Sequence, residues 1–193
     1  MTDYHALINT RLDGKRCIHS ESTADEAIKL AQRYGFDTQK AYTAGLLHDL
    51  AKCLSPQEAC EKAKAYGIGI NEYYENNPEL MHGAVGAAIA EYELHIHDEE
   101  ILSAIRCHTT GKKDMSLLDK IIYMADLIEP SRNFEGIDEI RRMAYEDLDK
   151  AIVMAVRSIL DYVMKRGLVI HPDTVDAYND IIIKRRNLFG TKV

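Results

Sequence analysis

The chain has few cysteines, and none of them has another cysteine as a close neighbour. The four are Cys17, Cys53, Cys60 and Cys107. Their wide spacing excludes a zinc ribbon and a thioredoxin-type pair, and it offers no obvious disulfide framework. We therefore expect buried, reduced thiols in a cytosolic protein.

Long apolar runs are also lacking. The N-terminal residues 1–17 contain no uninterrupted apolar stretch of the kind that a signal peptide needs, and no other segment is long and apolar enough to span a bilayer. The expectation is a cytoplasmic protein with no membrane partner.

Positive charge is in deficit. There are 24 Lys and Arg residues against 31 Asp and Glu residues, which gives a formal net charge of -7. Such a surface would repel a polyanion, so nucleic acid is not an expected partner. An anionic substrate would have to be held locally, by a metal ion and a few basic side chains.

Alternation with a period of two residues is absent, whereas apolar residues recur at spacings of three and four almost everywhere. This pattern predicts an all-α protein. With 193 residues and 46% hydrophobic content, residues 1–193 are expected to form one domain. A turn at 129–133 is expected to separate a histidine-rich part from a C-terminal helical part at about 138–189, because Pro130 should end the preceding helix. The predicted helices are roughly 3–16, 22–34, 38–52, 56–66, 79–94, 99–108, 115–128, 138–166 and 172–187.

Local residue chemistry marks several helix starts. Ser55, Pro56 and Glu58 offer an N-cap, a first-turn proline and a capping-box carboxylate. Asp98 and Asp114 are further N-cap candidates. The long helix predicted at 138–166 could form a homodimer or pack on the histidine-rich part, and the second arrangement is favoured.

His48 and Asp49 are the first candidates for chemistry. On a helix over 38–52 they would share one face with Lys52 and Gly45, opposite the apolar stripe. A lone His-Asp pair of this kind is more simply a solvated face. Gly45 argues against that interpretation, because a helical glycine costs about 1 kcal/mol relative to alanine and often marks close approach by a ligand or another backbone.

Similar residues recur at other predicted helix ends. His82 precedes a helix of small residues that would let neighbouring backbones pack tightly, and His108 ends a helix before a glycine C-cap at Gly111. Asp126 lies at the edge of an apolar stripe, where a reach into solvent is equally compatible with the spacing. His19, placed just before a helix, carries no local signal, and His5, His95 and His97 are interpreted as surface residues.

Imidazoles and carboxylates without a cysteine cluster suit iron, manganese, cobalt or zinc at a non-structural site. One or two such ions would lower the pKa of a bound water and neutralise charge on a phosphoryl oxygen. These residues therefore point to hydrolysis of a phosphate compound. The segment His171-Pro172 is interpreted first as a helix start, whose exposed amides could also receive phosphate oxygens.

Together, the motifs resemble those of the HD-domain phosphohydrolases, and more narrowly those of the YqeK-type symmetrical bis(5'-nucleosyl)-tetraphosphatases. The resemblance rests on 46–52 (LLHDLAK), 105–111 (IRCHTTG), 119–126 (DKIIYMAD), 129–132 (EPSR) and 170–179 (IHPDTVDAYN), with isolated His19 and His82. It implies an HD-domain helical bundle whose metal-binding core spans about 16–132, with the C-terminal helices packed against it. It also implies symmetrical hydrolysis of diadenosine tetraphosphate to two ADP at an iron centre, by a metal-bound hydroxide.

The resemblance assigns roles residue by residue. His19, His48, Asp49 and Asp126 would be the metal ligands, with Asp49 bridging if two ions are bound. His82 and His108 would hold a second metal, bond phosphate or protonate the leaving group, so the expected catalytic residues are Asp49, His82 and His108. The substrate contacts implied are His19, Lys52, His82, His108, Thr109, Asp126, Arg132, Val169, Ile170, His171, Pro172, Asp173 and Thr174.

Two other functions stay open. The same site could act on a deoxynucleotide monophosphate, a guanosine alarmone or a cyclic nucleotide, although the IHPDT phrase disfavours them. Alternatively, the chain could be a non-catalytic protein that binds ADP or GDP, which an intact ligand set counts against.

Overall fold

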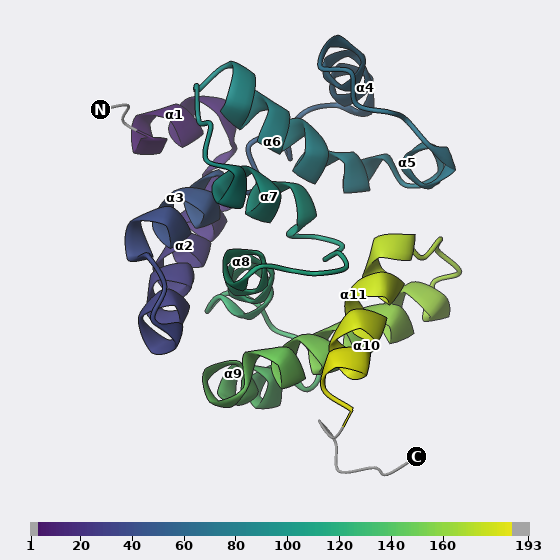
Figure 1. Ribbon diagram of the computed structural model, residues 1–193. Coiled ribbons are helices and arrows are strands. Elements are labelled where there is room, and N and C mark those ends of the chain that lie inside the picture. Colours follow the sequence, from purple (N-terminus) through teal and green to yellow (C-terminus); the bar gives the residue numbers. More distant parts are fainter. Residues whose placement is uncertain (1–3, 187–193) are drawn as a thin grey trace.

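The structure is a computed structural model, and it describes residues 4–186 of the chain. Every regular element among these residues is a helix, which confirms the predicted all-α class (Figure 1). None of the described helices is both long and apolar enough to cross a membrane. The first residue of the helix predicted at 3–16 and the last of the helix predicted at 172–187 lie outside the described residues.

The helices follow one another with short connections. In chain order they are α1 (Tyr4–Arg11), α2 (Gly14–Tyr34), α3 (Thr38–Leu47), α4 (Pro56–Ala65), α5 (Glu72–Asn76), the 3-10 turn η1 (Pro78–Leu80), α6 (Met81–Tyr92), α7 (Glu99–Cys107), α8 (Leu117–Ile128), α9 (Ile137–Glu146), α10 (Leu148–Lys165) and α11 (Pro172–Lys184).

Two of the three predicted N-caps are confirmed. Ser55 forms a full capping box with Glu58 at the start of α4, and Asp98 accepts hydrogen bonds from the first amides of α7. The third prediction, Asp114, is wrong, because Asp114 occupies a left-handed conformation with φ 55° and Ser116 caps α8 instead. The next helix end is as predicted, since α8 stops at Ile128 before Pro130.

The N-terminal prediction placed a helix over 3–16 and another from 22, and both boundaries are wrong. Helix α1 ends at Arg11, and Asp13 caps α2 by accepting a hydrogen bond from the Arg16 amide. Helix α2 therefore starts eight residues earlier than predicted. His19 consequently lies inside α2 and not in a loop before a helix.

The predicted helix at 38–52 is also wrong over its last five residues, 48–52. Helix α3 ends at Leu47, and the chain then turns through hydrogen bonds of the 3-10 type, such as that from the Lys52 amide to the Asp49 carbonyl. His48 and Asp49 thus leave the helix, and they are 0% and 3% exposed. The alternative of a solvated polar face on a continuous helix is therefore wrong.

The long helix predicted at 138–166 is two helices. Asp147 has an extended backbone (φ -150°, ψ 100°), and its side chain accepts a hydrogen bond from the Lys150 amide at the start of α10. A new helix start is thereby stabilised where the apolar pattern continues without a break. The buried first half of α10 packs on α8 and α9, so the predicted packing on the histidine-rich part is confirmed.

Close helix contacts depend on two glycines. A Cβ on Gly45 would lie 2.9 Å from the Ala24 Cα of α2, and a Cβ on Gly83 would lie 2.6 Å from the Arg106 carbonyl oxygen of α7. The predicted close approach of another backbone at Gly45 is therefore confirmed. Because α2 carries His19 and His108 directly follows α7, these contacts bring their histidines near His48 and His82.

The four cysteines are free, as expected. Cys17 and Cys107 are buried and Cys60 is half-buried, but Cys53 is exposed. The expectation of burial is therefore wrong for Cys53, which lies in the turn between α3 and α4.

Candidate metal centre

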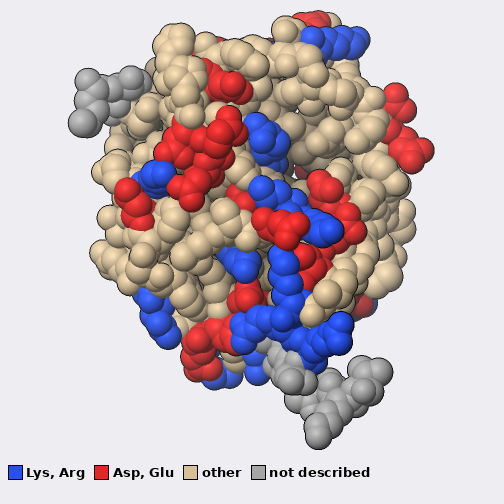
Figure 2. Space-filling model, in the orientation of Figure 1, with Lys and Arg blue, Asp and Glu red and all other residues tan. Residues whose placement is uncertain are grey.

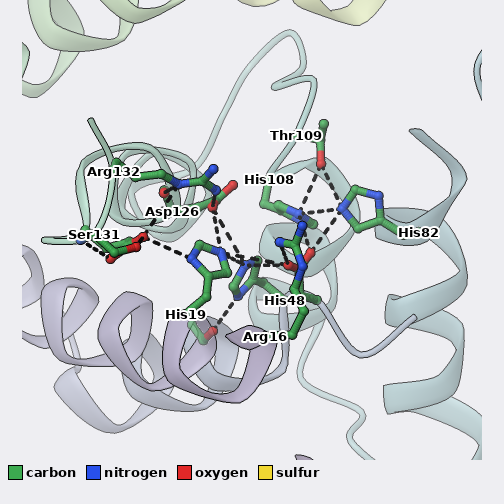
Figure 3. Close-up of polar contacts among 12 residues, drawn as sticks. Arg16, His19, His48, His82, His108, Thr109, Asp126, Ser131 and Arg132 are labelled. Carbon is green, nitrogen blue, oxygen red and sulfur yellow. Dashed lines mark hydrogen bonds and ion pairs between the residues drawn. The ribbon is translucent and has the colours of Figure 1, made fainter. Parts of the chain in front are cut away.

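Four histidines that are far apart in the sequence converge at the centre of the fold (Figure 3). His19 comes from α2, His48 follows the last residue of α3, His82 lies in the first turn of α6 and His108 follows α7. All four are less than 9% exposed. Asp126 of α8 and Asp49 join them, so the structure brings together the six residues that the sequence singled out as metal ligands.

Three of the histidines are oriented by the same local contact. The Nδ1 atoms of His48 and His108 lie 2.6 and 2.8 Å from the carbonyl oxygens of the residues three positions earlier, Gly45 and Ile105. His82 makes the equivalent contact with the Glu79 carbonyl oxygen. Because a carbonyl only accepts, each Nδ1 carries the proton and donates it, which leaves Nε2 as a lone-pair donor toward the centre.

A carboxylate holds His19 in the same tautomer, with the proton on Nδ1. Its Nδ1 lies 3.2 Å from Glu129 Oε1, and Glu129 is fully buried. Glu129 in turn accepts hydrogen bonds from the amide and the hydroxyl of Ser131. In many metal sites a buried carboxylate orients a metal-binding imidazole in this way.

One group of ligand atoms is formed by His19, His48 and Asp126. The His19 Nε2 atom lies 3.2 Å from His48 Nε2 and 3.0 Å from Asp126 Oδ1, and the distance from His48 Nε2 to Asp126 Oδ1 is 3.9 Å. These atoms are close enough to bind a single ion.

Asp49 connects this group to a second one. Its Oδ2 atom lies 3.6 Å from His48 Nε2, while its Oδ1 atom lies 3.2 Å from His82 Nε2 and 3.6 Å from His108 Nε2. Each oxygen of Asp49 thus faces a different set of imidazoles. This arrangement is that of a carboxylate able to bridge two ions.

The imidazole pairs themselves show that the residues fit a cation. His82 Nε2 and His108 Nε2 are 2.9 Å apart, and both have lone pairs because both Nδ1 atoms donate to carbonyls. Two facing lone pairs repel each other unless a positive ion or a proton lies between them. Nitrogen and carboxylate oxygen donors without thiolates suit a divalent first-row metal.

The charge states of His48, Asp49 and Asp126 at neutral pH agree with this fit. Burial lowers the pKa of His48 to about 4, so its imidazole is neutral. Burial opposes ionisation of Asp49 and Asp126, but the nearby histidines outweigh it and hold both pKa values well below the usual range. Arg132 adds to this effect at Asp126, because its guanidinium donates a hydrogen bond to Asp126 Oδ1.

Three contributors to the site escaped the sequence reasoning. Arg16 forms an ion pair with Asp49 (3.0 Å between NH1 and Oδ2), and Glu129 and Ser131 orient His19. Arg16 stands three residues before His19, so one turn of helix would have placed them on one face if α2 had been predicted to start early enough. Glu129 is 110 residues from His19, and no local pattern signals that contact.

A cavity of about 370 Å³ adjoins the cluster on the side of His108 and Asp126. Its lining includes the predicted substrate contacts His108, Thr109, Asp126, Arg132, Val169, Ile170, His171 and Thr174. The Thr109 hydroxyl also lies 3.0 Å from His108 Nε2. The predicted contacts Pro172 and Asp173, the first two residues of α11, do not line this cavity.

His171 leaves an unpaired donor at this cavity. It caps α11, since its Nδ1 accepts a hydrogen bond from the Asp173 amide. The neutral ring must then carry its proton on Nε2. This atom is buried and has no hydrogen-bond partner among the described residues, and the side chain is 9% exposed. A buried donor of this kind needs an acceptor that the described residues do not supply.

Lys52 is placed elsewhere. It lines a second cavity of about 420 Å³ with Arg16 and His82, and it does not line the cavity that contains Arg132. The structure therefore does not bring the two predicted phosphate-binding cations into one cavity. His5, His95 and His97 are exposed, as predicted.

Comparison with known proteins gives concordant results. Residues 16–131 match the family described as HD domain. The chain is 39% identical over 177 residues to a symmetrical bis(5'-nucleosyl)-tetraphosphatase of Bacillus subtilis, covering 92% of this chain and 95% of the relative. A protein with the same description from Staphylococcus aureus is 39% identical over 175 residues, and the match covers 90% of this chain and 90% of that protein.

A solved structure agrees with these matches. The crystal structure of a predicted HD superfamily hydrolase from Clostridium acetobutylicum, described as involved in NAD metabolism, is 40% identical and has a TM-score of 0.91. The match covers 94% of this chain and 96% of that one.

Proposed function

This chain belongs to the HD-domain family and, within it, to the YqeK-type symmetrical bis(5'-nucleosyl)-tetraphosphatases, and from that membership we propose that it hydrolyses diadenosine tetraphosphate symmetrically to two ADP. The observation that carries the proposal is the convergence of four imidazole Nε2 atoms on two buried carboxylates. A binding protein without turnover would have no need of this donor set.

The chain would hold one or two divalent ions, and we propose iron, with manganese, cobalt or zinc as the alternatives that the same donors accept. His19, His48, Asp49 and Asp126 would hold the first ion. A divalent ion bound there lowers the pKa of a water molecule and neutralises charge on a phosphoryl oxygen. The full burial of Glu129 and His48 keeps these donors fixed before substrate arrives.

His82 and His108 suit a ligand role better than an acid role. Both donate from Nδ1 to a carbonyl oxygen, so in the neutral ring Nε2 presents a lone pair to a metal ion. We therefore propose that they hold a second ion together with Asp49 Oδ1. Asp49 would then bridge the two ions through its two oxygens.

The cavity beside His108 would bind one nucleoside diphosphate half of the substrate. Arg132, which is half-buried and borders both the cluster and the cavity, is placed to stabilise charge on phosphate oxygens. The unpaired His171 Nε2–H would donate to an acceptor on this half, and segment 169–174 would cover it. The product is ADP, or GDP from a guanosine substrate, and the four free cysteines are compatible with action in the cytoplasm.

The test is analysis of bound metal followed by incubation of the metal-loaded protein with diadenosine tetraphosphate and chromatography of the products. Two ADP per substrate is the expected result. ATP plus AMP would contradict the symmetrical position of cleavage, and release of phosphate from a deoxynucleotide monophosphate or a guanosine alarmone alone would support the alternative substrates. Binding of ADP with no turnover of any nucleotide would contradict an enzymatic role.

A further inference from the structure

The two cavities described above share no lining residue, yet they meet at the metal cluster. The first cavity includes His108 and the second includes His82, and the Nε2 atoms of these histidines are only 2.9 Å apart. Their volumes of about 370 and 420 Å³ are similar, and both fall in the range of small-molecule sites.

The turn η1 forms the partition between them. Asn77 and Leu80 line the first cavity, whereas Pro78 and Glu79, which lie between them in the sequence, line the second. A short 3-10 turn suits this role, because residues three apart point in the same direction and those between point away. His82 lies two residues after Leu80, the last residue of η1. The partition is therefore adjacent in sequence to a member of the cluster.

Cations stand where the second cavity meets the cluster. The Nη1 atom of Arg16 forms an ion pair with the Asp49 carboxylate. In Figure 3, Arg16 approaches the cluster from a different side than Arg132 does. Lys52 is half-buried, and its ammonium has no carboxylate partner among residues 4–186, although its charge acts on His82. An unpaired ammonium beside a metal centre suits a phosphate oxygen.

The rest of the second cavity has the apolar character that a nucleoside needs. Ala51, Leu54, Pro56, Ala59 and Pro78 line it, and Cys53 lies at its rim. Asp13 and Glu79 also border it, and the Asp13 carboxylate already accepts a hydrogen bond from the Arg16 amide. On the face drawn in Figure 2, basic side chains are interspersed with acidic ones, so that face does not attract anions in general. Local cations must therefore hold the phosphates.

We propose that the second cavity, bounded by Arg16, Lys52 and Pro56, binds the other nucleoside diphosphate half of the dinucleotide. This inference rests on the proposed function, because only a substrate with two nucleosides requires two cavities. The central phosphates would lie across the His82–His108 contact, one half would extend toward Arg132 and the other toward Lys52. Cleavage at the centre then leaves one ADP in each cavity, which accounts for symmetrical products.

The experiment fills the second cavity and compares a two-nucleoside ligand with a one-nucleoside ligand. Cys53→Trp places a large ring at the rim, and the metal-loaded enzyme is assayed for its KM for diadenosine tetraphosphate and for competitive inhibition by ADP. ADP should prefer the first cavity, where His171 offers an unpaired donor. We expect KM to rise roughly tenfold or more while the inhibition constant of ADP changes by less than about twofold.

Two further variants keep the test decisive. Gln57→Trp adds the same ring on the exposed side of α4, outside the cavity, and should leave both constants unchanged. Lys52→Met removes the charge without adding bulk, and it should raise KM in the same direction even if Cys53→Trp is poorly folded. Equal changes in KM and in the inhibition constant of ADP in the two cavity variants, or no change in either constant, would overturn the proposal of a second subsite. Absence of turnover by the wild-type enzyme would instead overturn the proposed function.

Discussion

Arg16 lies 3.0 Å from Asp49, with its NH1 atom directed at Oδ2 of the carboxylate whose other oxygen faces His82 and His108. An arginine one turn before His19 on α2 therefore helps to hold the carboxylate that connects the two halves of the cluster. The Asp49 side chain is 4% exposed and that of Arg16 is 35% exposed, so the pair spans the boundary between the cluster and the second cavity.

Arg16→Ala should lower kcat/KM for diadenosine tetraphosphate by about 10-fold to 100-fold, because it removes both the partner of Asp49 and a cation from the second cavity. Arg16→Lys should recover only part of the loss, since an ammonium cannot reproduce the planar contact. Steady-state kinetics would measure both. Lys15→Ala is the matched control, because Lys15 is exposed on the same turn, and a similar loss there would contradict a specific role for Arg16.

Glu129→Gln should weaken metal binding by about 10-fold to 100-fold, because the amide supports the His19 imidazole less well than the buried carboxylate does. Activity should recover as the metal concentration is raised. Titration of the metal-free variant, followed by assay at each concentration, checks the expectation. Ser131→Ala should cause a smaller effect in the same direction, because Glu129 keeps its bond to the Ser131 amide. Unchanged metal affinity in Glu129→Gln would show that the contact with His19 is not needed.

Gly45→Ala should destabilise the protein by about 1–3 kcal/mol, despite the better helix propensity of alanine. The new Cβ would lie 2.9 Å from the Ala24 Cα, and backbone atoms cannot move away without separating α2 from α3. Because that separation also moves His19 from His48, bound metal should fall too. Thermal unfolding and metal analysis test both effects. Gly86→Ala is the control, since its Cβ meets nothing closer than 3.5 Å and should be neutral or stabilising by up to about 1 kcal/mol.

Glu93→Gln should reduce stability at neutral pH by about 1–2 kcal/mol, with a defined pH dependence. Burial opposes ionisation of Glu93, but hydrogen bonds from Lys62, Tyr66 and Arg11 outweigh it and lower its pKa from 4.5 to about 2. A folded-state pKa below the unfolded one stabilises the protein above about pH 4.5, and this stabilisation is lost as the pH falls toward 2.

Urea unfolding of wild type and Glu93→Gln between pH 7 and pH 3 measures this difference, which should shrink as the pH falls. Glu91→Gln, in the last turn of α6 just before Glu93, is the control, because the Glu91 carboxylate has no ion-pair partner within the described part of the chain. A difference between wild type and Glu93→Gln that stayed constant with pH would contradict the assigned cause.

The sequence by itself determined the helical class and the candidate metal ligands. The spacing of apolar residues at three and four positions specifies helices through local geometry, and capping groups such as Ser55 and Asp98 act within one turn. His48, Asp49, His82, His108 and Asp126 stand out because their residue types suit a metal. Local rules failed where tertiary contacts decide the outcome: the apolar pattern continues through Asp147, and nothing in it ends α3 at Leu47.

Only the tertiary structure decided how those ligands are organised. His19 meets Glu129 across 110 residues, and Gly45 and Gly83 bring helices close enough for imidazoles from four segments to face one another. The separation of Lys52 and Arg132 into two cavities depends on the position of η1, because residues at this turn line both cavities. These relationships depend on which helix faces meet, and that choice follows from burying the whole apolar surface at once, which no short segment of sequence encodes.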